Sequence, residues 1–202
     1  MPANLQMSRR IRRTPFTSCV EKLGISGFTV VNHTLLPKAF SYSVENDFFH
    51  LREAVQVWDV GCQRQVELEG PDALHLIQIM TPRNLDNAKI GQCMYLPLTN
   101  DEGKIINDPI LLRLSADKFW LSIADSDILL WARGLAIGMK LKVTVKEPDV
   151  SPLAVQGPSS QDLMVEVFGE GIKELGFFQF GFFKFNNTEQ VVALSLIHIS
   201  EP

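Results

Sequence analysis

The sequence predicts an α+β fold with mixed or antiparallel sheets and packed helices. Strand-like and helix-like segments follow one another without the strict alternation of a doubly wound parallel sheet. Three strand-like segments in the middle of the chain are separated by short polar turns, as in an antiparallel meander. A unit of strand, Gly-Pro and helix occurs twice. The 202 residues, 46% of them hydrophobic, suffice for one ordinary core or two small ones.

The first clear helix is predicted over residues 43–54. Ser43 can cap its beginning, and apolar residues from Val44 to Val55 recur at a spacing of three or four. This spacing places them on one face of the helix. We therefore expect an amphipathic helix whose apolar face packs against the core.

The repeated unit first occurs around Gly70-Pro71, after a strand with Val66 and Leu68 inward, and its proline can start the following helix. The unit returns at residues 153–168, around Gly157-Pro158. This recurrence favours an internal duplication of a small α+β unit. Gly-Pro between a strand and a helix is nevertheless common enough for coincidence to remain an equal alternative.

Three segments form the predicted antiparallel meander: 93–98, 105–114 and 119–124. Two four-residue polar turns join them. The Asp-Ser-Asp run at 125–127 can cap a helix that continues through Ile137, and residues 141–145 alternate as a further strand.

Charge and composition exclude several kinds of partner. The formal net charge is -4 and the sequence pI is about 5.6, so no nucleic acid or anionic membrane is expected to bind. No segment approaches the roughly 20 apolar residues that span a bilayer. The arginine-rich arm at 9–13 could be a targeting peptide, but Pro15 follows closely and no long apolar segment appears. We expect a soluble protein, and its oligomeric state stays open, a homo-oligomer included.

The cysteines and histidines give no sign of a metal site. Cys19, Cys62 and Cys93 are odd in number and far apart, and the four histidines lack the spacing of metal ligands. We therefore expect reduced, buried thiols in a reducing, cytoplasmic compartment, and no bound metal.

The strongest candidate site joins Tyr95 and Asp108. If residues 100–103 form the first hairpin loop, Tyr95 lies directly opposite Asp108, and both side chains project from one face with Cβ atoms roughly 5 Å apart. Three apolar residues share this face: Ile106, Ile110 and Leu112. Because a carboxylate among apolar neighbours needs a hydrogen bond, the pair is a candidate for acid–base chemistry or for anchoring a ligand.

Pro109 supports an irregular stretch at this position, because proline cannot donate to a strand ladder. The alternative is that Asp108 lies on a solvated face and Tyr95 is ordinary cross-strand packing. A change of one residue in loop length would send the two side chains to opposite faces.

Aromatic residues supply weaker candidates. Six phenylalanines between 177 and 185 could line a pocket for a flat or cationic ligand, but core packing is the favoured use. Trp58 and Trp120 could border a site, although a structural role is favoured for both. Asp125 is expected to cap a helix, with a role beside Asp108 as the alternative.

Several motifs spread from about residue 7 to about residue 193 resemble one known family. Besides the arginine-rich arm before Pro15-Phe16, they are Val57-Trp58-Asp59-Val60, Gly70-Pro71-Asp72-Ala73, Thr81-Pro82-Arg83-Asn84-Leu85, Asn107-Asp108-Pro109, Ile123-Ala124-Asp125-Ser126-Asp127 and Gln156-Gly157-Pro158. In combination they look like the glycine-cleavage T-protein (aminomethyltransferase) family, and within it like the dimethylsulfoniopropionate demethylases.

This resemblance implies the aminomethyltransferase folate-binding fold and a tetrahydrofolate-dependent methyltransferase. It implies that Asp108 contacts the folate and the transferring group, and that Tyr95 lines the folate pocket. Ile110 and Ser122 fall at neighbouring positions along the pteridine site. The implied reaction moves a methyl group from the sulfonium of dimethylsulfoniopropionate to N5 of tetrahydrofolate, which gives methylmercaptopropionate and 5-methyltetrahydrofolate.

Two alternatives share this folate site. A glycine-cleavage T-protein would take an aminomethyl group from a lipoyl carrier protein, but such proteins usually carry Asp-Asp-Leu where this chain has Asn107-Asp108-Pro109. A non-catalytic folate-binding protein on the same scaffold would turn over no donor.

The resemblance also implies a domain organisation. We expect residues 1–193 to form an N-terminal folate-binding region of two small α+β subdomains. After Ala193 the family continues with an Arg-Ser/Thr-Gly-aromatic segment, a further acidic folate ligand and a C-terminal barrel domain, which residues 194–202 do not resemble. This departure predicts a truncated region with an unrelated tail, an incomplete folate pocket and a chain that can be inactive by itself.

Overall fold

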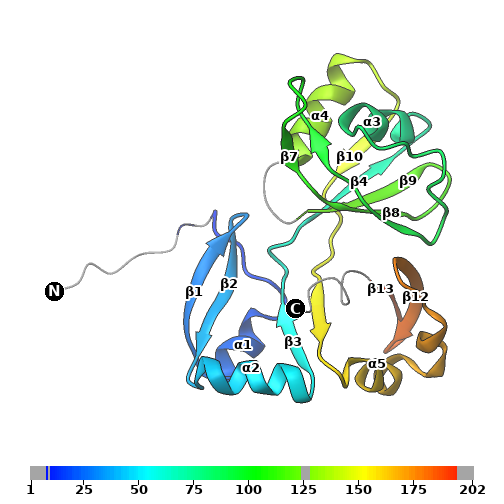
Figure 1. The fold of residues 1–202 in the computed structure, drawn as a ribbon. Helices are drawn as coiled ribbons and strands as arrows, with labels where there is room; N and C mark the ends of the chain where they lie inside the picture. The colour runs from blue at the N-terminus through cyan, green and yellow to red at the C-terminus, as the bar shows by residue number, and fades with distance from the viewer. Residues whose placement is uncertain (1–7, 9, 124–127, 195–202) are drawn as a thin grey trace.

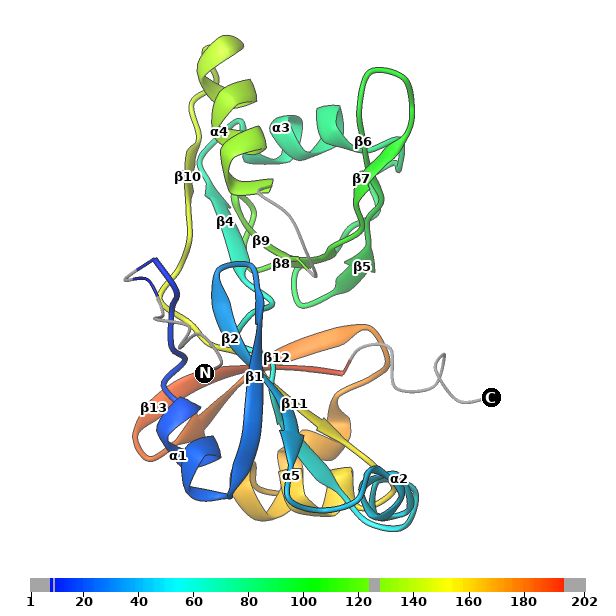
Figure 2. The same cartoon turned by 90° about the vertical axis from the view of Figure 1, so that its left-hand side faces the viewer.

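The computed structural model describes residues 8, 10–123 and 128–194. The chain forms two lobes, one above the other in Figure 1. The sheet lobe, residues 64–147, holds a five-stranded sheet and two helices (Figures 1 and 2). The hairpin lobe, residues 10–63 and 148–194, holds two hairpins, a two-stranded sheet and the remaining helices. Helices and antiparallel strands mix as predicted, so the α+β class is confirmed.

The five-stranded sheet is antiparallel throughout, with the order β10-β4-β9-β8-β5. Its strands are β4 (Gln65–Glu69), β5 (Cys93–Tyr95), β8 (Ile110–Arg113), β9 (Lys118–Ser122) and β10 (Thr144–Lys146). A separate short pair continues the hairpin outward, formed by β6 (Leu98–Thr99) and β7 (Ile105–Asn107).

Helices α3 (Ala73–Met80) and α4 (Ile128–Gly138) pack on one face of this sheet. Together with the strands they bury the main core, which includes Leu68, Ile77, Leu111, Phe119 and Ala132. Both helices were predicted, α3 from Gly70-Pro71 onward and α4 through Ile137. The predicted capping residues of α4 at 125–127 lie outside the described residues.

Strand β4 is buried on both faces. Val66 and Leu68 point into the core, as the alternation predicted. Gln65 and Glu67, which the same alternation would leave in solvent, are only 5% and 3% exposed. Alternation fixes which residues share a face, but what covers the second face depends on the rest of the fold.

The predicted meander exists, but two of its strands are broken. The first segment divides into β5 and β6, and the second divides into β7 and β8 at Asp108 and Pro109. Pro109 therefore lies in the irregular stretch predicted for it. Its carbonyl oxygen accepts a hydrogen bond from Leu96 N at 2.9 Å, which keeps the two broken strands together.

The hairpin lobe contains ten elements along the two segments of the chain. They are α1 (Thr17–Lys22), β1 (Ile25–Val31), β2 (Thr34–Phe40), α2 (Val44–Glu53), β3 (Gln56–Asp59), β11 (Leu153–Gln156), α5 (Ser160–Phe168), the 3-10 helix η1 (Glu170–Glu174), β12 (Gln179–Phe185) and β13 (Thr188–Leu194). Hairpins β1-β2 and β12-β13 and the pair β3-β11 form three separate two-stranded sheets.

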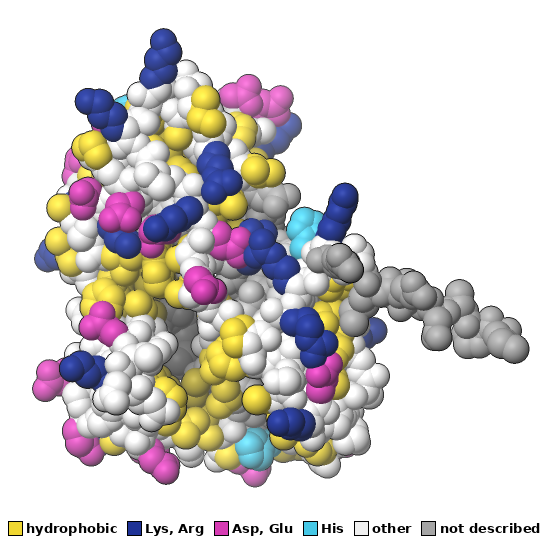
Figure 3. Space-filling model, turned by 180° about the vertical axis from the view of Figure 1, so that it is seen from behind, with side chains coloured by type: hydrophobic (Ala, Val, Ile, Leu, Met, Phe, Trp, Pro, Cys, Tyr) yellow, Lys and Arg dark blue, Asp and Glu magenta, His cyan; other side chains and the backbone are white. Residues whose placement is uncertain are grey.

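Helix α2 has the predicted position and cap but not the predicted packing. Ser43 caps it by accepting a hydrogen bond from Asn46 N at 3.1 Å. No residue of α2 is buried, however, and Val44 is 83% exposed. The expectation of a core-facing helix is therefore wrong for the described part of the chain, and apolar side chains are visible on the surface of the hairpin lobe in Figure 3.

Both predicted Gly-Pro units have the expected order of strand, Gly-Pro and helix, namely β4 to α3 and β11 to α5. Gly70 and Gly157 have φ angles of +143° and +121°. A Cβ atom at Gly70 would collide with the carbonyl oxygen of Lys142, and one at Gly157 with that of Ala54. Both positions thus require glycine for the same two physical reasons. The duplication itself stays a prediction.

No helix in the described ranges is long and apolar enough to cross a membrane. The same residues contain no group of three or more His, Cys, Asp or Glu side chains that could hold a metal ion. Cys62 and Cys93 are buried as predicted, whereas Cys19 is exposed. Burial raises the pKa of the Cys93 thiol to about 12, so this thiol is unreactive at neutral pH.

Candidate functional site

Four residues form one row across the sheet. Tyr95 pairs with Ile110, Ile110 with Ser122, and Ser122 with Gln65. Directly opposed residues of antiparallel strands project from the same face, so these four side chains share a face. The residues next to them in sequence, such as Leu111 and Leu121, point into the core on the other face. The row therefore lies on the face away from α3 and α4.

Asp108 joins this row through a hydrogen bond. The Tyr95 hydroxyl donates to Asp108 Oδ2 at 3.1 Å. The predicted meeting of the two side chains is thus confirmed, but the predicted register is wrong because Tyr95 pairs with Ile110. Asn100 N donates to Lys104 O, so the turn holds residues 101–103 and not 100–103, which moves the pairing by one residue. A register shift between Leu98 and Thr99 moves it by one more, so Asp108 lies diagonal to Tyr95 on the same side.

The surroundings of Asp108 are more open than predicted. Asp108 is exposed, whereas its two neighbours Asn107 and Pro109 are buried. The pKa of Tyr95 is raised, first by its hydrogen bond to Asp108 and then by partial loss of solvent and by the carboxylate charge. The phenol therefore stays protonated and directs its proton to the carboxylate, which remains open to a second donor from a ligand.

A buried carboxylate lies in the next row of the same face. Glu67 Oε2 accepts a hydrogen bond from Trp120 Nε1 at 2.8 Å, and the ammonium groups of Lys146 and Lys118 lie at 3.0 Å and 3.3 Å. Burial alone would raise the pKa of Glu67, but the bond from Trp120 and the two lysines outweigh it and lower the pKa.

This arrangement fixes the indole of Trp120 beside Ser122. Trp120 therefore borders the row and is also structural, which combines the two predicted uses. Sequence reasoning missed Glu67, since a glutamate in an alternating strand normally indicates a solvated position.

The phenylalanine run divides between core and surface. Phe178 and Phe180 pack with Cys93 and Leu112 on the face that carries the row. Others remain exposed, among them Phe177, Phe182 and Phe185. The favoured use in core packing is thus right for only part of the run. Asp125, the other predicted neighbour of Asp108, lies outside the described residues.

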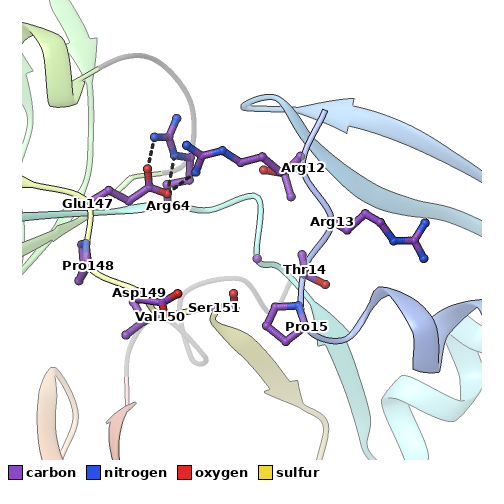
Figure 4. Close-up of a pocket in the computed structure, with 12 residues that line it drawn as sticks. Arg12, Arg13, Thr14, Pro15, Arg64, Glu147, Pro148, Asp149, Val150 and Ser151 are labelled. Atoms are coloured by element: carbon purple, nitrogen blue, oxygen red, sulfur yellow. Dashed lines mark hydrogen bonds and ion pairs between the residues drawn. The ribbon is translucent and has the colours of Figure 1, made fainter. Parts of the chain in front are cut away.

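An open pocket of about 360 Å³ lies between the lobes, away from Tyr95 and Asp108. Figure 4 shows its walls, formed by the arginine-rich arm and the segment after β10. Arg12 Nη1 donates to Glu147 Oε1 at 2.6 Å, and Arg64 Nε donates to the same oxygen at 3.0 Å. One carboxylate thus pairs with both guanidinium groups, and a second carboxylate, Asp149, also lines the pocket.

The arginine-rich arm is anchored rather than free. Besides the bond from Arg12, Thr14 Oγ1 donates to Asp59 Oδ2 at 2.5 Å, and Arg13 pairs with Glu21 at 2.6 Å. Two motifs singled out in the sequence, the arm and the segment around Trp58-Asp59, thus contact each other. Their role in the described structure is to hold the arm against both lobes.

Comparisons with known proteins identify the family. The model of the GCVT N-terminal domain matches residues 17–198. The chain belongs to this family. The GCVT N-terminal domain is the domain of the aminomethyltransferases that the motifs resembled, so the recognition made from the sequence is confirmed.

Individual GCVT relatives support the same conclusion. The chain is 49% identical over 193 residues to the dimethylsulfoniopropionate demethylase DmdA of Ruegeria pomeroyi. The aligned residues make up 96% of this chain and 53% of that protein. It is 28% identical over 174 residues to an aminomethyltransferase of Bacillus cereus, and the alignment covers 84% of this chain and 46% of that protein. The solved structure of the glycine cleavage system aminomethyltransferase T from Bartonella henselae superimposes with a TM-score of 0.75 at 25% identity. The superposition covers 84% of this chain and 47% of that one. The chain thus spans about half the length of these GCVT relatives.

Proposed function

We propose that this chain is part of a tetrahydrofolate-dependent methyltransferase that demethylates dimethylsulfoniopropionate. The supporting observation is the hydrogen bond of 3.1 Å between Tyr95 and Asp108, at the end of a row that includes Ile110 and Ser122. The 49% identity to a dimethylsulfoniopropionate demethylase favours this donor over the aminomethyl group, because the aminomethyltransferase relatives are only 28% identical.

The proposed folate site uses the groups of the row for different contacts. A pterin ring is flat and carries both N–H donors and acceptor atoms at its edge. Asp108 supplies an exposed acceptor for an N–H group, and Tyr95 fixes the orientation of that carboxylate. Ile110 offers apolar contact to the ring, and Ser122 offers a hydroxyl. These four residues fit a reduced folate, which acts as the methyl acceptor.

The proposed reaction needs no covalent enzyme intermediate, because a sulfonium is already a good leaving group. The lone pair of N5 forms the new N–CH₃ bond while the C–S bond breaks, and the thioether leaves with the bonding electrons. N5 then loses its proton, and the proposed role of Asp108 is to accept it directly or through water. Alignment of N5, methyl and sulfur with water excluded supplies most of the rate.

Replacement of Asp108 by Asn tests this role. We expect Asp108→Asn in the full-length protein to lower turnover of dimethylsulfoniopropionate by roughly a hundredfold or more, because the amide can neither accept the N5 proton nor keep the charge that orients the folate. Asp101→Asn, in the exposed turn of the same hairpin, is the matched control and should leave turnover unchanged. An Asp108→Asn enzyme within about threefold of wild type, roughly 0.7 kcal/mol in barrier, contradicts the proposal.

The identity of the one-carbon donor is tested by two assays with tetrahydrofolate, one with dimethylsulfoniopropionate and one with an aminomethyl group on a lipoyl carrier protein. Turnover of dimethylsulfoniopropionate alone supports the proposed function. Turnover of an aminomethyl group on a lipoyl carrier protein would assign the chain to the aminomethyltransferases instead. Folate binding without turnover of either donor would indicate a non-catalytic folate-binding protein. A cytoplasmic location belongs to the same proposal, since reduced folates and free thiols both need a reducing compartment.

A further inference from the structure

Gln65 is a buried polar residue to which the proposed function assigns no role. Its side chain is 5% exposed and lies at the end of the row, directly opposite Ser122. A buried amide must be hydrogen-bonded, and Gln65 Nε2 meets this need twice. It donates to Gln63 O at 3.2 Å and to Ser122 Oγ at 3.0 Å.

The backbone decides which way the amide of Gln65 points. An amide oxygen and an amide nitrogen have nearly the same size, so the partners must assign them. The carbonyl oxygen of Gln63 can only accept, and it therefore requires the NH₂ group of Gln65 on its side. That group has two protons, and the second is directed to Ser122 Oγ. Gln65 thus donates to the serine and does not accept from it.

This direction fixes the role of the Ser122 hydroxyl. Because its oxygen already accepts from Gln65, its own proton needs an acceptor elsewhere. We find no such acceptor among the residues that the structure describes. The hydroxyl lies on the face shared by Ile110 and Tyr95, so it presents a hydrogen-bond donor there.

We propose that Gln65 is a positioning residue that fixes Ser122 as a hydrogen-bond donor to an acceptor atom of the pterin ring. The inference rests on the proposed function and extends it. Asp108, at one end of the row, then accepts a hydrogen bond from an N–H group of the ligand. Ser122, near the other end, donates a hydrogen bond to an acceptor atom of the ligand, and Ile110 lies between the two. Such a polar order selects one orientation of a flat ring over its flipped alternative.

The test is a double-mutant cycle on the affinity for tetrahydrofolate, measured by calorimetry under reducing conditions with the full-length protein. Ser122→Ala removes the donor, and we expect it to weaken binding about fivefold to tenfold. Gln65→Met keeps the volume of the side chain but removes the hydrogen bond that orients the Ser122 hydroxyl, and we expect a similar loss of affinity for tetrahydrofolate. The double variant should bind no more weakly than Ser122→Ala alone, because Gln65 acts through the serine.

Gln65→Glu reverses the direction of the bond at nearly constant shape. A carboxylate can only accept, so it takes the proton of Ser122 away from the ligand and should weaken binding at least as much as Gln65→Met. Thermal unfolding of each variant shows that it is folded. If Gln65→Met does not fold, Gln65→Asn takes its place, since it keeps an amide but withdraws it from Ser122.

The outcomes separate this inference from the proposed function. If Asp108→Asn weakens folate binding while Gln65→Met leaves it unchanged, the inference is wrong and the proposed function stands. An equal loss from Gln65→Met in wild type and in the Ser122→Ala background also overturns it, because that result indicates a merely structural role. A wild-type protein that binds no tetrahydrofolate overturns both.

Discussion

The hydrogen bond between Tyr95 and Asp108 makes a prediction that needs no ligand. The chain has two tyrosines, so Tyr42→Phe leaves Tyr95 as the only phenol that titrates. We expect the pKa of Tyr95 to lie above the ordinary value of 10.0, because Asp108 accepts a hydrogen bond from the phenol and its charge repels the phenolate. Absorbance of the phenolate during an alkaline titration measures this pKa, and Asp108→Asn should lower it towards the ordinary value.

The same contact stabilises the folded chain at neutral pH and makes its stability depend on pH only at high pH. A group whose pKa is raised by folding contributes stability below its unfolded pKa, and this contribution disappears as the pH rises through the folded value. If Tyr95 titrates identically with Asp and with Asn at position 108, the bond does not persist in solution.

At the scale of elements, the turn between β11 and α5 depends on Gly157. Gly157→Ala should destabilise the chain by about 3 kcal/mol, because it adds a left-handed backbone strain and a collision with the Ala54 carbonyl oxygen. Gly169→Ala is the matched control: Gly169 has a φ of +87° but open space around it, so only the strain of about 1 kcal/mol applies. Urea unfolding measures both values, and equal losses would show that the collision is relieved by movement of α2.

At the scale of the whole molecule, Glu147 of the sheet lobe pairs with Arg12 of the arm, in the hairpin lobe, and with Arg64 at the start of its own lobe. Burial alone would raise the pKa of Glu147, but the hydrogen bonds and charges of Arg64 and Arg12 lower it below the ordinary 4.5. Its contribution to stability is therefore present above about pH 4.5 and is lost as the pH falls through the folded pKa.

We expect Glu147→Gln to lower the free energy of unfolding by about 1–3 kcal/mol at neutral pH, and the difference from wild type to shrink below about pH 4.5. Urea unfolding at a series of pH values measures this. Glu21→Gln removes the exposed partner of Arg13 and should cost about 0–1 kcal/mol. A difference that stays constant with pH would show that Glu147 acts by shape and not by charge.

The positions of elements follow from local chemistry, which the sequence contains. Ser43 accepts a backbone hydrogen bond at the start of α2, and Gly-Pro separates a strand from a helix twice, as predicted. Packing was less predictable: the apolar residues of α2 are spaced for burial, yet none is buried. A periodic pattern defines an apolar face, but only another element brought next to it can cover that face.

The sequence by itself determined the fold class, the helix capped by Ser43, the two Gly-Pro units, and the meeting of Tyr95 and Asp108, because these depend on local propensity and on the two-residue period of strands. Only the tertiary structure decided the register, through a three-residue turn after Asn100 and the shift between Leu98 and Thr99. It also decided that Gln65 and Glu67 are buried and hydrogen-bonded, since their partners Ser122 and Trp120 are more than fifty residues away. Contacts over such distances depend on how the whole chain closes, and no local pattern encodes them.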